Sequence, residues 1–278
     1  MERGVIAAYP DAAGVLSTAD TTLGFGLSRM IAAGPDDDLI RTDNQQPAIV
    51  AVSVAHLTGL MGAGKLPPPD FVAGHSLGEY SALVAAEALS YADALLLTRR
   101  RGELMQQHGA GAMAALIGLD AAAVEAIANE AGVEVANHNT PGQITVSGRH
   151  EAVEGAMALA TQRGARRALR LPVSAAFHSS LMAPVVDGLR PLVEQVEMRP
   201  AKVPLVTNVD AAPITHPDDL RRELLEQICA PVRWIDVVAR LRTEGVTTFY
   251  EVGPGKVLAG LIARIIRDAR VVTAESLL

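Results

Sequence analysis

Gly74-His75-Ser76-Leu77-Gly78 is the stretch of this sequence that decides the fold. It follows the short run Asp70-Phe71-Val72-Ala73 and leads into an apolar run at 80–86 that favours a helix. A buried strand that turns sharply at small residues and continues as an apolar helix gives Gly-x-Ser-x-Gly the geometry of a nucleophile elbow. The sequence therefore predicts a strand, a tight turn and a helix within a layered α/β domain.

Ser76 is the candidate nucleophile of this elbow. The flanking glycines allow the backbone to fold tightly enough to lift one side chain out of the turn. The helix that starts behind the turn supplies free backbone N–H groups, which stabilise a developing negative charge. A glycine-rich turn without chemistry is the alternative, because so short a motif also arises by chance.

The composition predicts a globular protein that folds on its own in a reducing compartment. With 278 residues, 49% of them hydrophobic, the chain can bury a large core. Its formal charge of −7 argues against nucleic acid or an anionic membrane as the main partner. The single cysteine, Cys229, excludes an internal disulfide framework, and residues 1–6 lack the apolar core of a signal peptide. We therefore expect a cytoplasmic protein with Cys229 as a small buried side chain.

Helices dominate the prediction for the first 109 residues. Residues 1–31 have a helical pattern that is broken at Pro10. Residues 45–64 form an uncharged run with several polar interruptions, which predicts a buried core helix rather than a membrane span. Residues 90–107 predict another helix, with Ser90 as its N-cap.

The pattern changes between residues 110 and 173. We expect strands at 112–118, 133–137, 143–147 and 167–173, with helices at 120–131 and 151–163. This β-α-β-β-α-β order is the split arrangement called ferredoxin-like. The sequence therefore predicts a small ferredoxin-like subdomain at 110–173, inserted into a larger subdomain made of residues 1–109 and 174–278.

The larger subdomain resumes after the insertion. We expect helices at 182–196, from 217, from 231 and up to 266, and strands at 204–207, 247–252 and 270–273. Strands that alternate with helices imply a parallel sheet covered on both faces. The predicted fold class is therefore α/β: an α/β-hydrolase-like large subdomain with a parallel sheet, plus the inserted small one.

A serine nucleophile needs a general base, because its hydroxyl is almost wholly protonated at neutral pH. His178 is the candidate, since it lies where the insertion returns to the larger subdomain and clefts between subdomains often bind ligands. A structural loop histidine is the alternative. His75 is adjacent to Ser76 and should point away from it, so we expect a packing role. The other histidines are expected to be structural or solvated, and none has metal-ligand spacing: His56, His108, His138, His150 and His216.

Arg101 is the third candidate, at the end of the run Arg99-Arg100-Arg101. On a helix these three side chains point in different directions, so at most one or two can lie in a cleft. A guanidinium beside the nucleophile would hold a substrate carboxylate in a bidentate pair. A solvated basic helix end is the alternative.

At these residues the sequence resembles the malonyl-CoA:acyl carrier protein transacylases and the related acyltransferase domains of polyketide synthases. The resemblance runs from about Ala7 to the end of the chain. The matching stretches follow the family's order and lie at 46–48, 74–83, 101–106, 137–148, 176–182, 231–234 and 251–258. Several motifs in register make this signal specific.

The resemblance implies a role for each candidate residue. Ser76 would be acylated, His178 would act as its base, and Arg101 would bind the free carboxylate of the malonyl group. The backbone N–H of Leu77 would contribute to the oxyanion hole. The backbone carbonyl of Gln227 would orient the histidine, in place of an acidic residue.

The reaction that the resemblance implies is ping-pong acyl transfer. Ser76 would attack the thioester of malonyl-CoA, and the phosphopantetheine thiol of an acyl carrier protein would then attack the malonyl-serine, in fatty acid or polyketide biosynthesis. Residues 176–178 resemble the malonyl-selective form of polyketide acyltransferases. No metal and no cofactor besides the carrier's phosphopantetheine are implied, and the family suggests a monomer.

Family members begin with a strand and a Gly-Gln-Gly-Ser-Gln loop that supplies a second oxyanion-hole N–H, and this sequence starts at a point that matches the residues after that loop. We therefore expect a strand and one donor to be missing, through truncation or in a weakened relative. Three alternatives stay open: a serine esterase or thioesterase with the same dyad, a non-catalytic carrier-protein-binding relative, and the malonyl-transferring subunit of a malonate decarboxylase.

Overall fold

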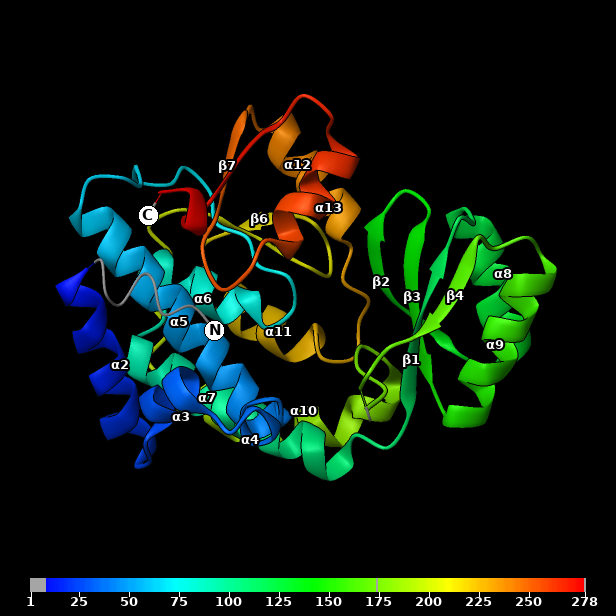
Figure 1. The fold of residues 1–278 in the computed structure, drawn as a ribbon, viewed down its shortest axis with the longest axis horizontal. Helices are drawn as coiled ribbons and strands as arrows, with labels where there is room; N and C mark the ends of the chain where they lie inside the picture. The colour runs from blue at the N-terminus through cyan, green and yellow to red at the C-terminus, as the bar shows by residue number, and fades with distance from the viewer. Residues whose placement is uncertain (1–8, 174, 278) are drawn as a thin grey trace.

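The computed structural model describes residues 9–173 and 175–277, which form a helix-rich body and a separate four-stranded sheet (Figure 1). The body contains the elements before residue 109 and most of those after residue 175. Two expectations fall outside the described residues: the helical pattern and signal-peptide analysis of residues 1–8, and the predicted boundary at residue 174.

The first part of the body packs around one long helix, α5. The elements are α2 Pro10–Leu23, α3 Leu27–Ala33, α4 Asp36–Leu39, α5 Thr42–Gly62, α6 Gly78–Ala85 and α7 Tyr91–His108. Buried residues lie all around α5, as expected for a helix enclosed by others, which confirms the core helix predicted at 45–64. Ser90 caps α7 by accepting a hydrogen bond from the Asp93 N–H, also as predicted. Within the ranges that the structure describes, no helix is both long and apolar enough to cross a membrane.

The four-stranded sheet and its two helices confirm the ferredoxin-like arrangement. The elements are β1 Ala112–Ile117, α8 Ala121–Ala131, β2 Glu134–Thr140, β3 Gln143–Gly148, α9 His150–Gln162 and β4 Arg167–Arg170. The strand order is β2-β3-β1-β4, with every pairing antiparallel. Helices α8 and α9 cover one side of the sheet (Figure 1), where Val124, Ile127 and Val146 form part of a separate apolar core. These elements lie within 110–173, and the subdomain boundaries stay a prediction.

The chain then returns to the body. The elements are η1 Ser180–Met182, α10 Ala183–Gln195, β5 Leu205–Val206, β6 Pro213–Ile214, α11 Pro217–Glu226, α12 Trp234–Thr243, β7 Thr248–Glu251, α13 Val257–Ile265, β8 Arg270–Thr273 and η2 Ala274–Leu277. Helix α12 begins later than the predicted residue 231, because Val232 forms a parallel bridge with Asn137 of β2. This bridge joins the sheet to the body.

The parallel pairings of the body fall into two groups. Strands β7 and β8 pair in parallel, and Val72 forms a parallel bridge with Leu205 of β5. A cavity of about 550 Å³ is lined both by residues 70–74 and by β7, together with apolar side chains of α5, α6 and α12. Within the described residues, the parallel pairing expected for the larger subdomain therefore consists of the β7–β8 pair and the Val72–Leu205 bridge, and β5 pairs antiparallel with β6.

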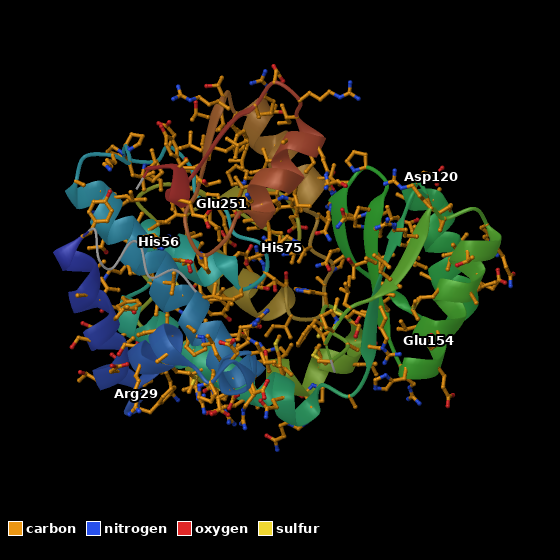
Figure 2. The ribbon with its side chains drawn as sticks, viewed as in Figure 1. Arg29, His56, His75, Asp120, Glu154 and Glu251 are labelled. Atoms are coloured by element: carbon orange, nitrogen blue, oxygen red, sulfur yellow. The ribbon has the colours of Figure 1, made fainter. Side chains whose placement is uncertain are left out.

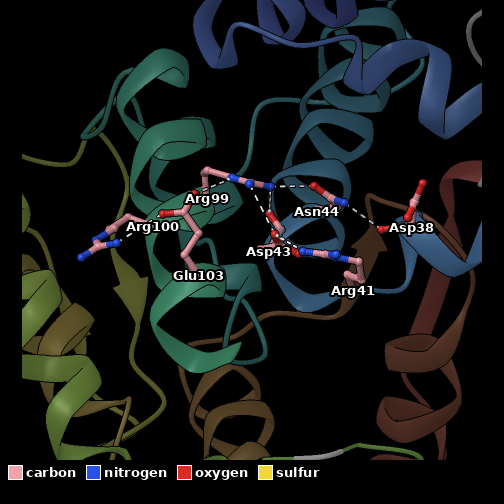
Figure 3. A network of polar contacts seen from close by, with 7 residues as sticks. All are labelled: Asp38, Arg41, Asp43, Asn44, Arg99, Arg100 and Glu103. Carbon is pink, nitrogen blue, oxygen red and sulfur yellow. Dashed lines mark hydrogen bonds and ion pairs between the residues drawn. The ribbon is translucent and has the colours of Figure 1, made fainter. Parts of the chain in front are cut away.

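Helices α5 and α7 are joined at one end by a polar network (Figure 3). Arg99 of α7 donates hydrogen bonds to the Asp43 carbonyl and to Asn44 Oδ1, at 2.9 and 2.6 Å, and forms an ion pair with Asp43. Next to it the helices almost touch, since a Cβ on Gly102 would lie 2.5 Å from the carbonyl oxygen of Thr42. This junction fixes Gln46 of α5 opposite Arg101 of α7.

The chain crosses between the body and the sheet at two adjacent segments. The outgoing segment includes Gly111, which has a φ of 151°. A Cβ on Gly111 would lie 2.6 Å from the Cβ of Ala176 on the returning segment. Because Ala176 comes two residues before His178, the geometry of this crossing determines where the histidine lies relative to the body.

Candidate active site

The elbow has the predicted turn and helix, with α6 beginning at Gly78. In place of the strand predicted before the turn, the structure has a single parallel bridge from Val72 to Leu205. A Cβ on Gly74 would lie 2.0 Å from the Gly78 carbonyl carbon, so this position accepts only glycine. Ser76 has a φ of 52°, which an L-residue adopts only at a cost. The turn thus presents Ser76, half-buried, at its apex.

His178 is the partner of Ser76. Its Nε2 lies 2.8 Å from Ser76 Oγ. Its Nδ1 lies 2.8 Å from the carbonyl oxygen of Gln227 and 3.1 Å from that of Ala230. Carbonyl oxygens only accept hydrogen bonds, so Nδ1 carries the proton and the Nε2 lone pair accepts from the serine hydroxyl. The ring is therefore held in the tautomer that a general base requires.

The surroundings of His178 keep it neutral. Burial, with the positive charge of Arg101 as the next cause, lowers the pKa of His178 to about 3. His178 also has a φ of 56°, so both members of the pair hold unfavourable backbone conformations. Such strain persists only where the surrounding structure enforces it.

Arg101 lies beside the nucleophile, where a guanidinium that binds a substrate carboxylate is expected. Its Nη2 donates to Ser76 Oγ at 3.0 Å and its Nη1 donates to Gln46 Oε1 at 2.8 Å. Its Nε is buried without a hydrogen-bond partner among the described residues. Arg101 is 3% exposed, and burial lowers the pKa of its guanidinium. Among the described residues, the hydrogen-bond acceptors of Arg101 are the neutral side chains of Gln46, Ser76 and Gln227, which leaves its charge available to an anionic ligand.

Leu77 and Gln227 also lie at the site. The Leu77 N–H directly precedes α6 and has no acceptor within the described ranges, as an oxyanion donor requires. The carbonyl of Gln227 contacts His178, where the resemblance places it. The Gln227 side chain makes further contacts that the sequence did not indicate: its Nε2 donates to the Ser76 carbonyl at 3.3 Å and to Glu79 Oε2 at 3.0 Å.

Sequence analysis missed the buried polar residues behind the elbow. Glu79 and Asn208 are fully buried, and Glu223 is 4% exposed. Glu79 directly follows the Gly-x-Ser-x-Gly motif, and an acidic residue at the start of an apolar helix is a signal that could have identified it. Nothing in the local sequence distinguishes Asn208 or Glu223.

The remaining histidines take no part in this arrangement. His75 lies between the body and the sheet (Figure 2), where its Nε2 lies 2.9 Å from Asn139 Oδ1 and its ring packs against Trp234. This confirms the packing role expected for it, and burial lowers its pKa. His56 is buried in α5, while Cys229 is half-buried and packs against the core. In the parts of the chain that the structure describes, no three His, Cys, Asp or Glu side chains are arranged to bind a metal.

Comparison with known proteins agrees with this geometry. Residues 11–277 match the family model described as "Acyl transferase domain". The chain is 44% identical to a Bacillus subtilis malonyl CoA-acyl carrier protein transacylase, over 96% of this chain and 86% of that protein. It is 42% identical to the Escherichia coli K12 protein of the same name, over 96% of this chain and 88% of that protein.

Solved structures give the same result. An acyl-carrier-protein S-malonyltransferase from Burkholderia pseudomallei superimposes with a TM-score of 0.95 at 40% identity, over 100% of this chain and 94% of that one. A malonyl-transacylase solved in complex with a type II polyketide synthase acyl carrier protein superimposes with a TM-score of 0.93 at 37% identity, over 96% of this chain and 88% of that one. The chain belongs to the malonyl-CoA:acyl carrier protein transacylase family of acyl transferase domains.

Proposed function

We propose that this chain transfers the malonyl group from malonyl-CoA to the phosphopantetheine thiol of an acyl carrier protein, with Ser76 as the nucleophile. The observation that carries the proposal is the position of Arg101. The guanidinium is buried, its described acceptors are neutral, and its Nη2 lies 3.0 Å from Ser76 Oγ. It can therefore bind a carboxylate at the far end of an acyl group attached to Ser76, and a malonyl group has its free carboxylate at that end.

His178 would act as general base and then as general acid. As Ser76 Oγ forms a bond to the thioester carbon, its proton passes to His178 Nε2, 2.8 Å away. The carbonyl oxygens of Gln227 and Ala230 then stabilise the charged ring through Nδ1. When the carbon–sulfur bond breaks, the same proton passes to the departing CoA thiolate. The second half-reaction repeats these steps in reverse, with the carrier's thiol as the attacking group.

Arg101 would also link substrate recognition to the strength of the base. The positive charge of Arg101 contributes to the low pKa of His178. A bound malonyl carboxylate compensates that charge, so proton transfer to His178 becomes less costly when the correct acyl group is in place. An acyl group without a carboxylate leaves the base weak.

The remaining features of the function are proposed on the same basis. The described Ser76, His178 and Arg101 come from one chain, so a monomer suffices. No resident cofactor or metal is needed, because the substrate and the carrier's prosthetic group supply both thiols. Acyl carrier protein is the proposed partner, as it is for the malonyl-transacylase solved with one. A cytoplasmic location fits a chain whose only cysteine is unpaired.

Intact-mass measurement tests this function directly. The purified chain is mixed with malonyl-CoA, in parallel with the Ser76→Ala and Arg101→Ala variants. The parent chain should gain one malonyl group, Ser76→Ala should gain none, and adding phosphopantetheinylated carrier protein should remove the adduct and malonylate the carrier.

Two outcomes would contradict the proposal. No adduct on a folded parent chain would exclude Ser76 as a working nucleophile. An adduct that is lost to water at the same rate with and without carrier protein would identify a thioesterase instead.

A further inference from the structure

Asn208 joins the two sides of the elbow with its side-chain amide. Its Oδ1 accepts a hydrogen bond from the Ser76 backbone N–H at 2.7 Å, and its Nδ2 donates to the Gly74 carbonyl at 2.6 Å. These two backbone groups belong to residues on either side of His75, at the tightest part of the turn. Asn208 comes from the loop after β5, 132 residues further along the chain than Ser76.

Glu79 holds Asn208 in this position. Its Oε1 accepts from both the side-chain Nδ2 and the backbone N–H of Asn208, at 2.7 and 2.9 Å. Its Oε2 accepts from Gln227 Nε2 at 3.0 Å, and the same Nε2 donates to the Ser76 carbonyl. The backbone N–H of Ser76 is therefore bound through Asn208 and its carbonyl through Gln227, and both of these side chains contact Glu79.

Glu223 completes the cluster from α11. Its Oε1 accepts from the backbone N–H groups of Asn208 and Val209, at 2.9 and 3.1 Å. Burial and the adjacent Glu223 raise the pKa of Glu79 well above its usual value. Burial and the neighbouring carboxyl group of Glu223 therefore favour the protonated form of Glu79, while the positive charge of Arg101 opposes this shift.

We propose that Asn208 and Glu79 are positioning residues that hold Ser76 in its positive-φ conformation, so that Ser76 Oγ stays in line with His178 and Arg101 during acyl transfer. The inference rests on the function proposed above and adds to it a second layer of residues that touch no substrate atom.

The strain at Ser76 explains why such a layer is needed. A positive φ at a residue other than glycine costs on the order of 1–3 kcal/mol, so an unsupported turn would relax. Relaxation would swing Oγ away from His178 Nε2, and a displacement of about 1 Å in a reacting atom costs about 10²-fold in rate. Gln227 adds a direct link, because its carbonyl holds His178 while its side chain holds Ser76.

A purely structural role predicts a different result. Buried polar residues commonly serve only to satisfy one another, in which case their loss lowers stability and leaves each folded molecule fully active. The two roles are separated by the acylation rate constant of the folded chain, measured apart from the fraction that is folded.

The test uses single-turnover malonylation of Ser76, followed by rapid-quench mass spectrometry and normalised to folded chain. The variants are Asn208→Ala, Glu79→Ala and Glu79→Gln, with Val153→Ala as the control. Val153 is fully buried in the separate core of the four-stranded sheet, so its truncation lowers stability without contacting the elbow. The concentration of malonyl-CoA that gives half the maximal rate is recorded for each variant.

Positioning predicts that both alanine variants lose about 10²-fold in the maximal rate, with little change in the half-saturating malonyl-CoA concentration, because Arg101 is intact. Glu79→Gln should recover part of the rate, since its amide oxygen keeps the acceptor for Asn208 while its amide nitrogen can no longer accept from Gln227 Nε2. Val153→Ala should acylate at the parent rate per folded chain.

The proposal would be overturned if the alanine variants acylated at the parent rate per folded chain. Failure of both alanine variants to fold would assign these side chains to the fold alone and would overturn it equally. A parent chain that is never malonylated would instead defeat the proposed function, so the two failures are distinguishable.

Discussion

Arg99, Arg100 and Arg101 follow one another on α7 and have three different surroundings. Arg99 binds the first turn of α5, Arg100 forms an ion pair with Glu103 at the surface, and Arg101 is buried beside Ser76. Helical geometry predicts this divergence from the sequence. Which of the three points into the cleft is settled by tertiary packing, and in the sequence only the resemblance favours Arg101.

Replacing Arg101 should change selectivity as well as rate. In Arg101→Ala the malonyl carboxylate loses its hydrogen-bonded partner. Loss of such a charged pair costs about 3 kcal/mol, so kcat/KM for malonyl-CoA should fall by at least 10²-fold. The rate with acetyl-CoA should rise or stay constant, because removing the positive charge of Arg101 raises the pKa of His178 and makes it a stronger base. Competition between the two thioesters, read by intact mass, measures the ratio. An equal loss for both would contradict the carboxylate role.

The low pKa of His178 gives a second prediction. The folded pKa of about 3 lies below the ordinary value of 6.5, so the unfolded chain binds the extra proton first as the pH falls. This contribution to stability is complete above pH 6.5 and is lost as the pH falls towards 3, with a slope of about 1.4 kcal/mol per pH unit.

The measurement is urea unfolding at several pH values between 3 and 6.5, the interval set by the two His178 pKa values, for the parent and for His178→Gln. Because Glu79 titrates in the opposite sense, the informative quantity is the difference in slope between the two proteins. The parent should lose stability more steeply than the variant. Equal slopes would show that the histidine is solvated and charged in the folded state.

Helices α5 and α7 act as a unit because Arg99 ties them together (Figure 3). Arg99→Ala would remove two hydrogen bonds and an ion pair to residues 43 and 44, where the Asp43 carboxyl is largely buried. We expect a loss of about 1–3 kcal/mol in the free energy of unfolding. Arg100→Ala is the matched control, since the ion pair that Arg100 forms with Glu103 lies at the surface and is worth less than about 1 kcal/mol.

Chemical denaturation of the two variants measures this difference. Gln46 and Arg101 lie on the two joined helices, so Arg99→Ala should also raise the half-saturating concentration of malonyl-CoA. Equal stability of the Arg99 and Arg100 variants would mean that apolar packing alone sets the α5–α7 junction.

The elements that the sequence predicted well are those whose signal is local. Ser90 before α7 and the alternation of strands and helices at 112–170 required no knowledge of distant contacts. The start of α12 was misplaced because Val232 pairs with β2, a contact across more than ninety residues. β6 was missed because two residues carry no periodic pattern.

The site shows the same division. Ser76 could be found from its motif, because the elbow is a local structure. His178 and Arg101 were selected from position and resemblance, and the structure brings both within 3.0 Å of Ser76 Oγ. Asn208 and Glu223 have no local signal, since their importance arises only when the loop after β5 and helix α11 pack behind the elbow.

At the scale of the whole molecule, the relation between body and sheet depends on the double crossing at Gly111 and Ala176. Gly111→Ala would force the two segments apart, because its new methyl group would collide with the Ala176 side chain and its φ of 151° disfavours alanine. His178 lies just beyond Ala176, so misalignment of His178 should slow acylation of the variant at least tenfold per folded chain. This corresponds to an increase of about 1.4 kcal/mol in the activation free energy.

Gly155→Ala is the control for this change. Gly155 is exposed on α9 with nothing within 4 Å of a new methyl group, so the variant should be stabilised by about 0.5–1 kcal/mol with an unchanged acylation rate. Single-turnover malonylation and thermal unfolding of both variants provide the comparison. An unimpaired Gly111→Ala would show that the crossing at Gly111 and Ala176 does not control the position of His178.

The positive φ values at Ser76 and His178 align the catalytic pair at the expense of the free energy of unfolding. Each strained residue lowers the stability of the native state by on the order of 1–3 kcal/mol, and glycine at either position would recover part of that loss. Selection of variants for thermal stability alone would therefore be expected to replace Ser76 and His178 by glycine. The two conformations that align the catalytic pair therefore lower the free energy of unfolding.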